Sequence, residues 1–180
     1  MIDTVMFDLL MLAMLLPGPR HGYQLKHEAG IILGYDVLHN NLVYPLLRRF
    51  TKNKWVSRKT VPGQRGQTRH QYSLTASGRK ALVARLSSFT EQDARSAEAF
   101  QLRVGLFRLL EPEVRGRILE AREKFLRARI ATLTNIQASF PLDRYAGQVV
   151  SRLRAESESE LDWIAHLRRL EKSRKEDSHE

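Results

Sequence analysis

Five polar side chains between positions 40 and 49 have the types needed to read the edges of DNA bases. Asparagine can bond to two atoms of adenine at once, and arginine to two atoms of guanine. Positions 41, 44, 45 and 48 share one face of a helix, largely opposite the leucines of the same segment. The pattern predicts a helix that presents polar side chains to DNA: Asn40, Asn41, Tyr44, Arg48 and Arg49.

Some of these residues have a structural alternative. Asn40 can cap the start of the helix instead of reading a base. Tyr44 is explained equally well as a half-buried packing residue and as a hydroxyl donor to phosphate. Arg49 can contact phosphate or simply be solvated. His21, earlier in the chain, is expected to cap a helix rather than to read DNA. The sequence alone leaves these alternatives open.

A second group of basic and amide side chains lies in and around a Pro/Gly loop between two short strands. Gly63 and Gly66 permit a tight backbone at its tip. We expect Arg65 to enter the minor groove, and Lys59 and Arg69 to lie beside phosphates. A loop tip that is merely solvated is the alternative. The candidate contacts of this wing are Lys59, Gln64, Arg65, Gln67 and Arg69.

These side chains require three helices and a two-stranded β-ribbon to position them. Apolar periodicity predicts helices at residues 4–16, 21–32 and 40–52. The second of these carries Tyr23 and Lys26, and we expect one of the two to contact phosphate. A helix and a β-ribbon are both elements that the major groove admits. The order helix, strand, basic loop, strand therefore predicts a winged helix-turn-helix.

The rest of the chain predicts long helices with one apolar stripe each, at residues 94–110, 112–139 and 142–172. A hairpin of the last two can bury only part of these stripes, so a second copy of the chain is the predicted cover. A self-contained three-helix bundle is the alternative. The expected fold is mainly α, with a winged-helix domain at 1–90, a helical dimerisation domain at 91–172 and a polar tail at 173–180.

Aromatic residues in the helical part indicate a possible small-molecule effector site. At helical spacing such residues more often form a core, which is the other explanation. An arginine among them is the candidate partner for an anionic group. The candidates are Phe100, Arg103, Phe107, Tyr145 and Trp163.

The net charge of +10 is concentrated in one half of the chain. Residues 1–90 carry 13 Lys and Arg against 4 Asp and Glu, whereas residues 91–180 carry 17 against 16. A local basic excess is expected of a protein that binds nucleic acid, although an inert basic surface has the same composition. The absence of cysteine excludes disulfides and fits a reducing compartment. The apolar N-terminus is too short to span a bilayer, so we expect a soluble, cytoplasmic protein.

The sequence contains no motif that predicts an enzyme. The six histidines lack the paired spacing of metal ligands, and no phosphate-binding loop, dinucleotide-binding motif or nucleophile elbow is present. We expect no catalytic residues, no metal and no cofactor.

Several segments together resemble the PadR family of transcriptional regulators. They are LAML at 12–15, HGYQL at 21–25, VYPLLRR at 43–49, RHQYSL at 69–74 and SGR at 77–79, with FQLR at 100–103 and ELDWI at 160–164 similar to the subfamily that has the longer helical C-terminal domain. The resemblance implies a homodimeric repressor on a pseudo-palindromic operator, released by a phenolic acid or another aromatic compound. The chain departs from the family at Asn40–Leu42, where small residues are commoner, and at Lys54, where a glycine is usual.

Overall fold

The computed structural model describes residues 4–34, 38–62 and 68–176, with side chains as far as residue 171. The chain divides into two compact units, Met1–Ser88 and Phe89–Glu180. Within the described ranges, no helix is both long and apolar enough to cross a lipid bilayer.

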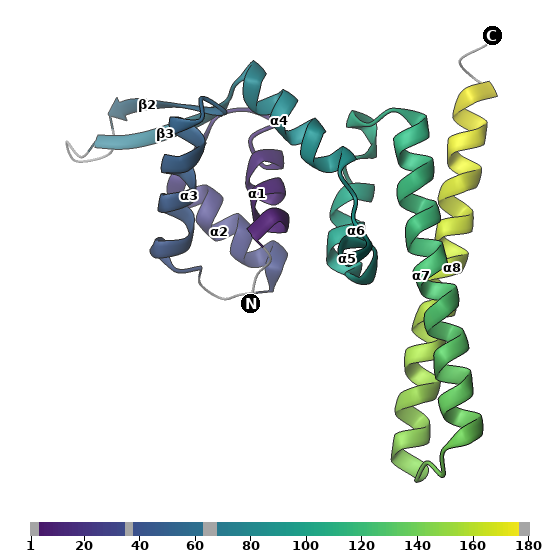
Figure 1. The fold of residues 1–180 in the computed structure, drawn as a ribbon. Coiled ribbons are helices and arrows are strands. Elements are labelled where there is room, and N and C mark those ends of the chain that lie inside the picture. Colours follow the sequence, from purple (N-terminus) through teal and green to yellow (C-terminus); the bar gives the residue numbers. More distant parts are fainter. Residues whose placement is uncertain (1–3, 35–37, 63–67, 177–180) are drawn as a thin grey trace. The chain divides into compact units, whose positions relative to one another are not determined.

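The first unit contains four helices and a small sheet (Figure 1). The helices are α1 (Thr4–Ala13), α2 (Gly22–Leu33), α3 (Asn40–Lys52) and α4 (Ala76–Ser87). Their apolar faces meet in one core, in which each fully buried side chain removes its surface from water. The core includes Leu9, Leu12, Leu25, Leu47, Phe50, Leu82 and Leu86. The predicted winged helix-turn-helix in a mainly α fold is confirmed.

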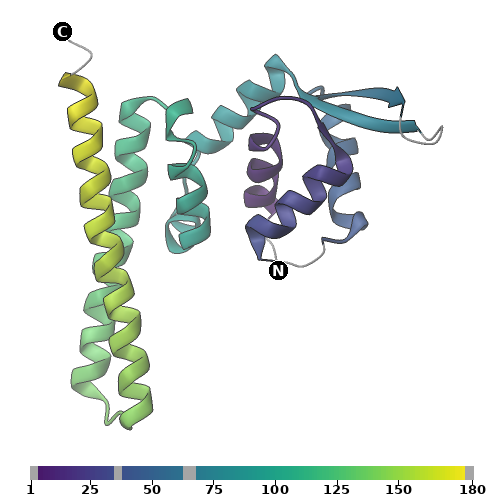
Figure 2. The same ribbon diagram turned by 180° about the vertical axis from the view of Figure 1, so that it is seen from behind.

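The sheet has a third strand that the sequence did not predict. Strands β2 (Val56–Pro62) and β3 (Thr68–Leu74) form the expected antiparallel ribbon, which projects from the helices as the wing (Figures 1 and 2). A two-residue strand, β1 (Arg20–His21), pairs with the other edge of β3, so the order is β1-β3-β2. Two residues are too short to show the alternation by which strands are predicted.

The base of the wing is tied to the start of α4 by hydroxyl groups. Lys54 has a φ of 58°, which is a left-handed conformation that glycine adopts most easily. Its carbonyl oxygen accepts hydrogen bonds from Thr75 Oγ1 at 2.7 Å and Ser77 Oγ at 2.6 Å. Gly78 is required there, because a Cβ at this position would lie 2.0 Å from the Trp55 oxygen. Lys54 thus adopts a left-handed conformation at a point where its carbonyl group is tied to the start of α4.

The second unit begins with short helices rather than with the single helix predicted for residues 94–110. It contains α5 (Glu91–Arg95), α6 (Ala97–Val104) and a 3₁₀ turn, η2 (Phe107–Leu109). Thr90 and Asp93 form a capping box that starts α5, and the Ser96 hydroxyl accepts from the Ala99 N–H to start α6. These caps divide an apolar stripe that is continuous in the sequence. Helical periodicity alone cannot reveal this division. Helix α4 ends at Ser87 and α5 begins at Glu91, so the chain is not one continuous helix across this segment.

Two long antiparallel helices, α7 (Pro112–Ser139) and α8 (Arg144–Glu176), form the rest of this unit and lie side by side in both ribbon views (Figures 1 and 2). Asp143 caps α8, because its side chain accepts from the N–H groups of Tyr145 at 2.7 Å and Ala146 at 3.0 Å. These bonds hold the pKa of the Asp143 carboxyl below its ordinary value.

Candidate nucleic-acid interface

Helix α3 buries one side and exposes the other. Its buried residues are Val43, Leu46, Leu47 and Phe50. Asn41, Arg48 and Arg49 are exposed, and Tyr44 is half-buried. The helix therefore presents most of the side chains predicted to read DNA, and its apolar side fixes their direction.

The start of α3 differs from the prediction in one respect. His39, not Asn40, is the N-cap residue, and Asn40 is the first residue of the helix. The side chain of Asn40 instead accepts a hydrogen bond from Lys26 Nζ of α2 at 3.2 Å. Two residues predicted to contact DNA are therefore bonded to each other and lie at one exposed edge of the unit.

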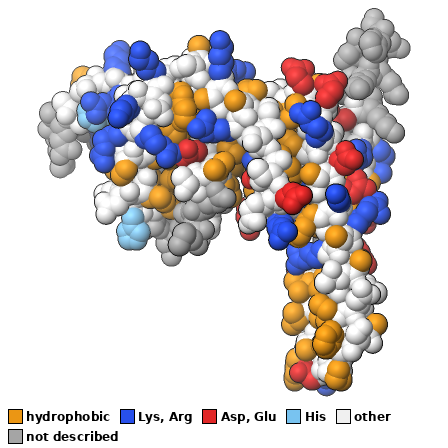
Figure 3. All heavy atoms as spheres, viewed as in Figure 1, with side chains coloured by type: hydrophobic (Ala, Val, Ile, Leu, Met, Phe, Trp, Pro, Cys, Tyr) orange, Lys and Arg blue, Asp and Glu red, His pale blue; other side chains and the backbone are white. Residues whose placement is uncertain are grey.

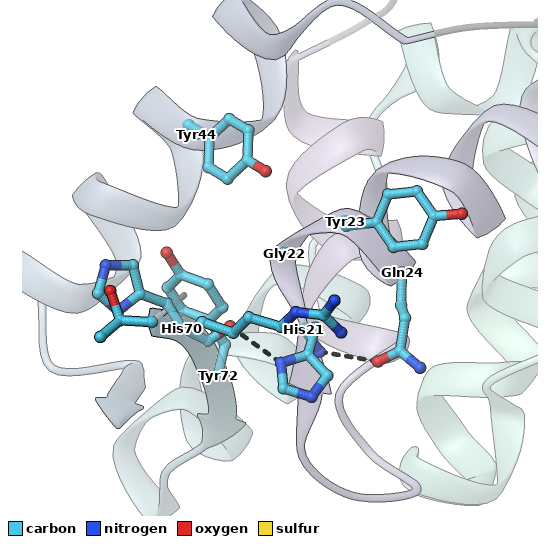
Figure 4. Close-up of a pocket in the computed structure, with 9 residues that line it drawn as sticks. His21, Gly22, Tyr23, Gln24, Tyr44, His70 and Tyr72 are labelled. Atoms are coloured by element: carbon cyan, nitrogen blue, oxygen red, sulfur yellow. Dashed lines mark hydrogen bonds between the residues drawn. The ribbon is translucent and has the colours of Figure 1, made fainter. Parts of the chain in front are cut away.

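An open groove lies where the start of α2, the first half of α3 and strand β3 meet (Figure 4). Its volume is about 540 Å³, and Gly22, Tyr23, Tyr44, Arg69 and His70 are among the residues that line it. Tyr23 is 66% exposed and stacks on the ring of His27, with 6.2 Å between the ring centroids. The groove is thus bordered by hydroxyl, imidazole and guanidinium groups, which are suited to phosphate oxygens.

The glycine at the start of α2 allows two tyrosines to approach closely. A Cβ on Gly22 would lie 3.0 Å from Tyr44 Cε1 and 3.3 Å from Tyr72 Cε2. Tyr72 of β3 is buried, and Figure 4 shows its ring between β3 and the helix that carries Tyr44. Burial raises the pKa of the Tyr72 phenol, and the positive charges of Arg58 and Arg48 oppose this effect in part.

His21 occupies the N-cap position of α2, as predicted from the sequence. Its backbone N–H donates to Gln24 Oε1 at 2.9 Å, and its Nδ1 lies 3.3 Å from the His70 carbonyl oxygen of β3. Both contacts are drawn in Figure 4. His21 therefore joins α2 to β3 and helps to set the width of the groove.

Arg49 is held by a carboxylate on another helix. Its guanidinium forms an ion pair with Asp8 of α1, whose side chain is buried. Burial raises the pKa of the Asp8 carboxyl, and the charge of Arg49 lowers it by a smaller amount. The ion pair directs Arg49 toward α1, so this residue links two helices whatever its contact with DNA.

The wing divides its side chains between two faces. In the register of the ribbon, Arg58 lies opposite Tyr72, and Lys59 lies opposite Gln71. Cross-strand partners share a face and successive residues alternate, so Arg58 lies on the face of buried Tyr72 and Lys59 lies on the other. Arg69 lies on the opposite face of β3 from Tyr72, although Arg69 is one of the residues that line the groove. Gln64, Arg65 and Gln67 lie outside the described residues.

Arg58, Tyr72 and His70 were missed by reasoning from the sequence. Alternation along β3 places His70 and Tyr72 on one face, but the partner of each depends on the register across the ribbon. The long connection between the strands left this register open, so Lys59 was chosen although its neighbour Arg58 shares the face of Tyr72.

Some basic side chains of the first unit form ion pairs with carboxylates, and others do not. Arg20 pairs with Glu28 at 2.7 Å and Arg49 pairs with Asp8. Within the described ranges, no carboxylate forms an ion pair with the cations of α3 and the wing that follow: Arg48, Arg58, Lys59 and Arg69. Figure 3 shows Lys and Arg side chains gathered over this unit with few acidic ones between them, whereas both signs alternate along the second unit.

The five effector candidates are not brought to one place. Phe100 is buried and meets the Trp163 ring edge-on, with 5.7 Å between the centroids. Arg103 is buried, pairs with Asp93 at 3.1 Å and donates to the Ala99 carbonyl. Phe107 is buried in its own turn, and Tyr145 is 80% exposed near the start of α8. Phe100 and Trp163 are thus neighbours, while Arg103 already has a carboxylate partner and Tyr145 lies apart.

A shallow second groove lies beside Trp163. It has a volume of about 430 Å³ and is lined by Gln101, Arg152, Ala155, Glu156, Ser159, Glu160 and Trp163. Both carboxylates that line it already form ion pairs, Glu156 with Arg152 and Glu160 with buried Arg122. Trp163 is the one predicted effector residue that lines this groove.

One family model and several solved structures match parts or most of this chain. The model of the "Transcriptional regulator PadR-like family" matches residues 11–84. Bacillus subtilis PadR in complex with operator DNA is 16% identical, with 92% of this chain and 98% of that chain covered and a TM-score of 0.45. A transcriptional regulator of Thermoplasma acidophilum is 24% identical over 56% of this chain and 85% of that chain, with a TM-score of 0.41.

A Streptococcus mutans protein is 29% identical over 46% of this chain and 74% of that chain, with a TM-score of 0.39. No curated protein matches the sequence. At these TM-scores the solved structures add little, and the assignment rests on the family model. The matched segment contains α2, α3, the groove and the wing. Residues 11–84 of this chain, which include the winged helix, are therefore similar to the PadR-like family of transcriptional regulators.

Proposed function

We propose that the protein is a sequence-specific, homodimeric repressor that binds a pseudo-palindromic operator in the cytoplasm. The carrying observation is that α3 and the wing expose cations without carboxylate partners among the described residues: Arg48, Arg58, Lys59 and Arg69. Such charges attract the phosphate backbone, and Asn41 and Arg48 on the exposed side of α3 are available for base edges.

The groove beside α3 supports a backbone contact next to the base-reading face. The first residues of α2 line this groove. The free N–H groups at the start of a helix and its dipole both favour an anion there. Tyr23 and Tyr44 border the same groove with exposed or half-buried hydroxyl groups. One phosphate oxygen here would fix the register of α3 in the major groove. Tyr23 thereby becomes the preferred phosphate contact of α2, because Lys26 is bonded to Asn40.

The homodimer is proposed from the second unit. Large apolar side chains remain exposed at the end of the α7–α8 hairpin, where Phe140 is 62%, Tyr145 80% and Val149 58% exposed. Tyr145 and Val149 are one turn apart on α8 and lie on one face. Figure 3 shows hydrophobic side chains, in orange, gathered at this end of the hairpin. A second copy is the cover that a repressor with two half-sites requires.

A small aromatic effector would act by shifting the dimer between two states. The groove beside Trp163 is the place in the described part of the second unit where an aromatic ring can meet an indole and polar groups. An effector that prefers the dimer geometry with the wrong half-site spacing would lower the affinity for DNA.

The test is binding of the full chain to a DNA fragment from upstream of its own gene, measured by fluorescence anisotropy over a range of salt concentrations. We expect log K to fall linearly with log salt, by about 0.9 for each phosphate neutralised. A scrambled fragment of the same length should bind more weakly. A flat salt plot would contradict the proposal.

Two rival functions have their own outcomes in this experiment. Equal affinity for the native and scrambled fragments would indicate an architectural DNA-binding protein. The absence of DNA binding at low salt would indicate an adaptor whose winged helix binds another protein.

A further inference from the structure

Four side chains from three elements surround the junction of α3 and the wing. Tyr44 and Arg48 lie one helical turn apart on α3, Arg58 is on β2, and Tyr72 is on β3. We call these residues the Tyr72 cluster. The cluster is built around a buried ring, because Tyr72 is 5% exposed and packs beside Gly22 and Tyr44.

The register of the wing places Arg58 on the same face of the ribbon as this ring. Arg58 and Tyr72 are direct cross-strand partners, so their side chains share the face of the ribbon that packs on the helices. Arg48 lies one turn after Tyr44, whose ring meets Tyr72 at Gly22, and the positive charges of Arg58 and Arg48 both lower the pKa of the Tyr72 phenol against the larger effect of burial. They approach it from different elements, one from the wing and one from α3.

Neither arginine is neutralised within the part of the chain that the structure describes. The ion pairs of this unit engage Arg20 and Arg49 instead. Two like charges held near one another without an acid repel, and an anion placed between them removes the repulsion. Guanidinium groups bind phosphate oxygens in a fork geometry, which makes a phosphate the best matched anion.

We propose that Arg48 and Arg58 hold one DNA backbone phosphate between α3 and the wing, and that Tyr72 is a positioning residue that orients Arg58. The proposal rests on the proposed DNA-binding function and deepens it, because it assigns a phosphate contact to a wing residue. It also gives Arg48 a phosphate in place of a base edge, so that Asn41 is the residue of α3 left to read bases. The phosphate would be bound by side chains from two elements at once. This contact would therefore fix the angle between α3 and the wing.

An exposed lysine outside the interface provides the control. Arg58→Gln and Lys80→Gln each remove one positive charge from an exposed residue of the first unit, but Lys80 lies on α4, whereas Arg58 lies on the face of Tyr72. We expect Arg58→Gln to weaken binding of the full chain roughly tenfold and to lower the salt slope by about 0.9. Lys80→Gln should change the affinity by roughly twofold or less, because a charge outside the contact acts through screened solvent. Thermal melting of each variant checks that the fold is retained.

Two further measurements identify the contact. A phosphate contact carries no sequence information, so Arg58→Gln should weaken cognate and scrambled fragments by the same factor. If both arginines hold one phosphate, the double variant Arg48→Gln/Arg58→Gln should lose less than the product of the two single losses. Tyr72→Phe should weaken binding in the wild-type background and not in the Arg58→Gln background.

Equal losses for Arg58→Gln and Lys80→Gln would overturn the proposal, because net charge alone would explain them. Independent losses for Arg48 and Arg58 would assign them to separate phosphates and also overturn it. In both cases the wild type still binds DNA, and the proposed function stands. If wild-type protein shows no salt-dependent binding to any fragment, both proposals fail.

Discussion

Gly22 shows how closely the interface is built at the scale of single residues. The absence of a side chain at this position lets Tyr44 and Tyr72 meet over the start of α2. A Cβ would press on both rings, at 3.0 and 3.3 Å, so the rings would have to shift by a few tenths of an ångström. Since Tyr44 borders the groove and Tyr72 supports the wing, both sides of the interface depend on this one position.

Gly22→Ala is therefore expected to weaken DNA binding more than it weakens the fold. The displaced Tyr44 ring should lower the affinity for the native fragment several-fold, by roughly 1 kcal/mol for one lost phosphate contact. Gly116→Ala is the control, because a Cβ there meets nothing within 4 Å and it lies inside α7. The control should raise stability by up to about 1 kcal/mol and leave DNA binding unchanged. Anisotropy and urea unfolding measure the two effects, and equal DNA affinity for Gly22→Ala and wild type would contradict the expectation.

Asp8 gives a second prediction at this scale, from its pH dependence. Burial raises the pKa of its carboxyl, so folding holds its proton to a higher pH than the unfolded chain does. Its contribution to stability is complete below the ordinary pKa of 3.8 and is lost as the pH rises through the folded value. The free energy of unfolding of wild type, relative to Asp8→Asn, should therefore fall as the pH rises across this range. Urea unfolding of both proteins in a pH series measures it. A difference that grows with pH would show that the ion pair with Arg49 outweighs burial.

Single residues also show what could be predicted from the sequence. The exposed set on α3 follows from helical spacing, and Lys54, where the resemblance led us to expect a glycine, has a φ of 58°. Asn40 and Arg49 were harder to predict. Their partners, Lys26 and Asp8, come from other helices. Helical spacing orders residues within one element, and it contains no information about contacts between elements.

At the scale of elements, buried arginines join the helices of the second unit. Arg122 of α7 is 1% exposed and forms a two-bond ion pair with Glu160 of α8, at 2.8 and 2.7 Å. It also donates to the Ala94 carbonyl of α5 at 2.7 Å. One guanidinium thus connects three helices, and Phe100 and Phe125 cover it. The sequence indicated only surface charges here, because a charged residue is normally assigned to the solvated side of a helix.

Glu160→Gln should consequently destabilise the second unit by roughly 3 kcal/mol, since it leaves a buried guanidinium without its counter-charge. Glu156→Gln is the matched control one turn earlier on α8. Its partner Arg152 is largely exposed, so the expected loss is under about 0.5 kcal/mol. Urea unfolding followed by circular dichroism compares the two variants. Similar small losses in both would show that Arg122 is solvated and not dependent on this ion pair.

The boundaries of elements were predicted where caps are recognisable and missed where they divide an apolar stripe. Pro112 is the first residue of α7, and the sequence predicted a helix that begins there. The stripe from residue 94 to 110 contains α5, α6 and η2, because Thr90 and Ser96 each start a new helix. A hydroxyl that accepts from a backbone N–H overrides periodicity at these points.

At the scale of the whole molecule, the unequal charge of the two halves and the exposed apolar side chains suggest a different role for each half: DNA binding for the first and dimerisation for the second. The basic half contains the family segment, and the nearly neutral half ends in a helical hairpin with uncovered Tyr145 and Val149. A dimer would let two winged helices bind one DNA, and the second binding event would then occur at high effective concentration. The assignment of residues 91–172 to dimerisation remains a prediction.

Val149→Arg tests this division directly, with Gln148→Arg as the control. Both changes add one positive charge to neighbouring exposed residues of α8, but only Val149 belongs to the apolar face with Tyr145. If that face is covered by a second copy, Val149→Arg buries a charge in the interface, and light scattering should give the mass of one chain. Gln148→Arg should keep the mass of two.

The DNA affinities of the two variants should then separate. Val149→Arg should weaken binding to the full operator by about 100-fold, the factor at the lower end of what linkage of two sites provides. Its affinity for a single half-site should match that of Gln148→Arg, because the winged helix itself is unchanged. A Val149→Arg protein that remains dimeric would place the interface elsewhere on the chain. A monomeric variant with full operator affinity would show instead that each winged helix binds independently, and the helical unit would then need a role other than joining two copies.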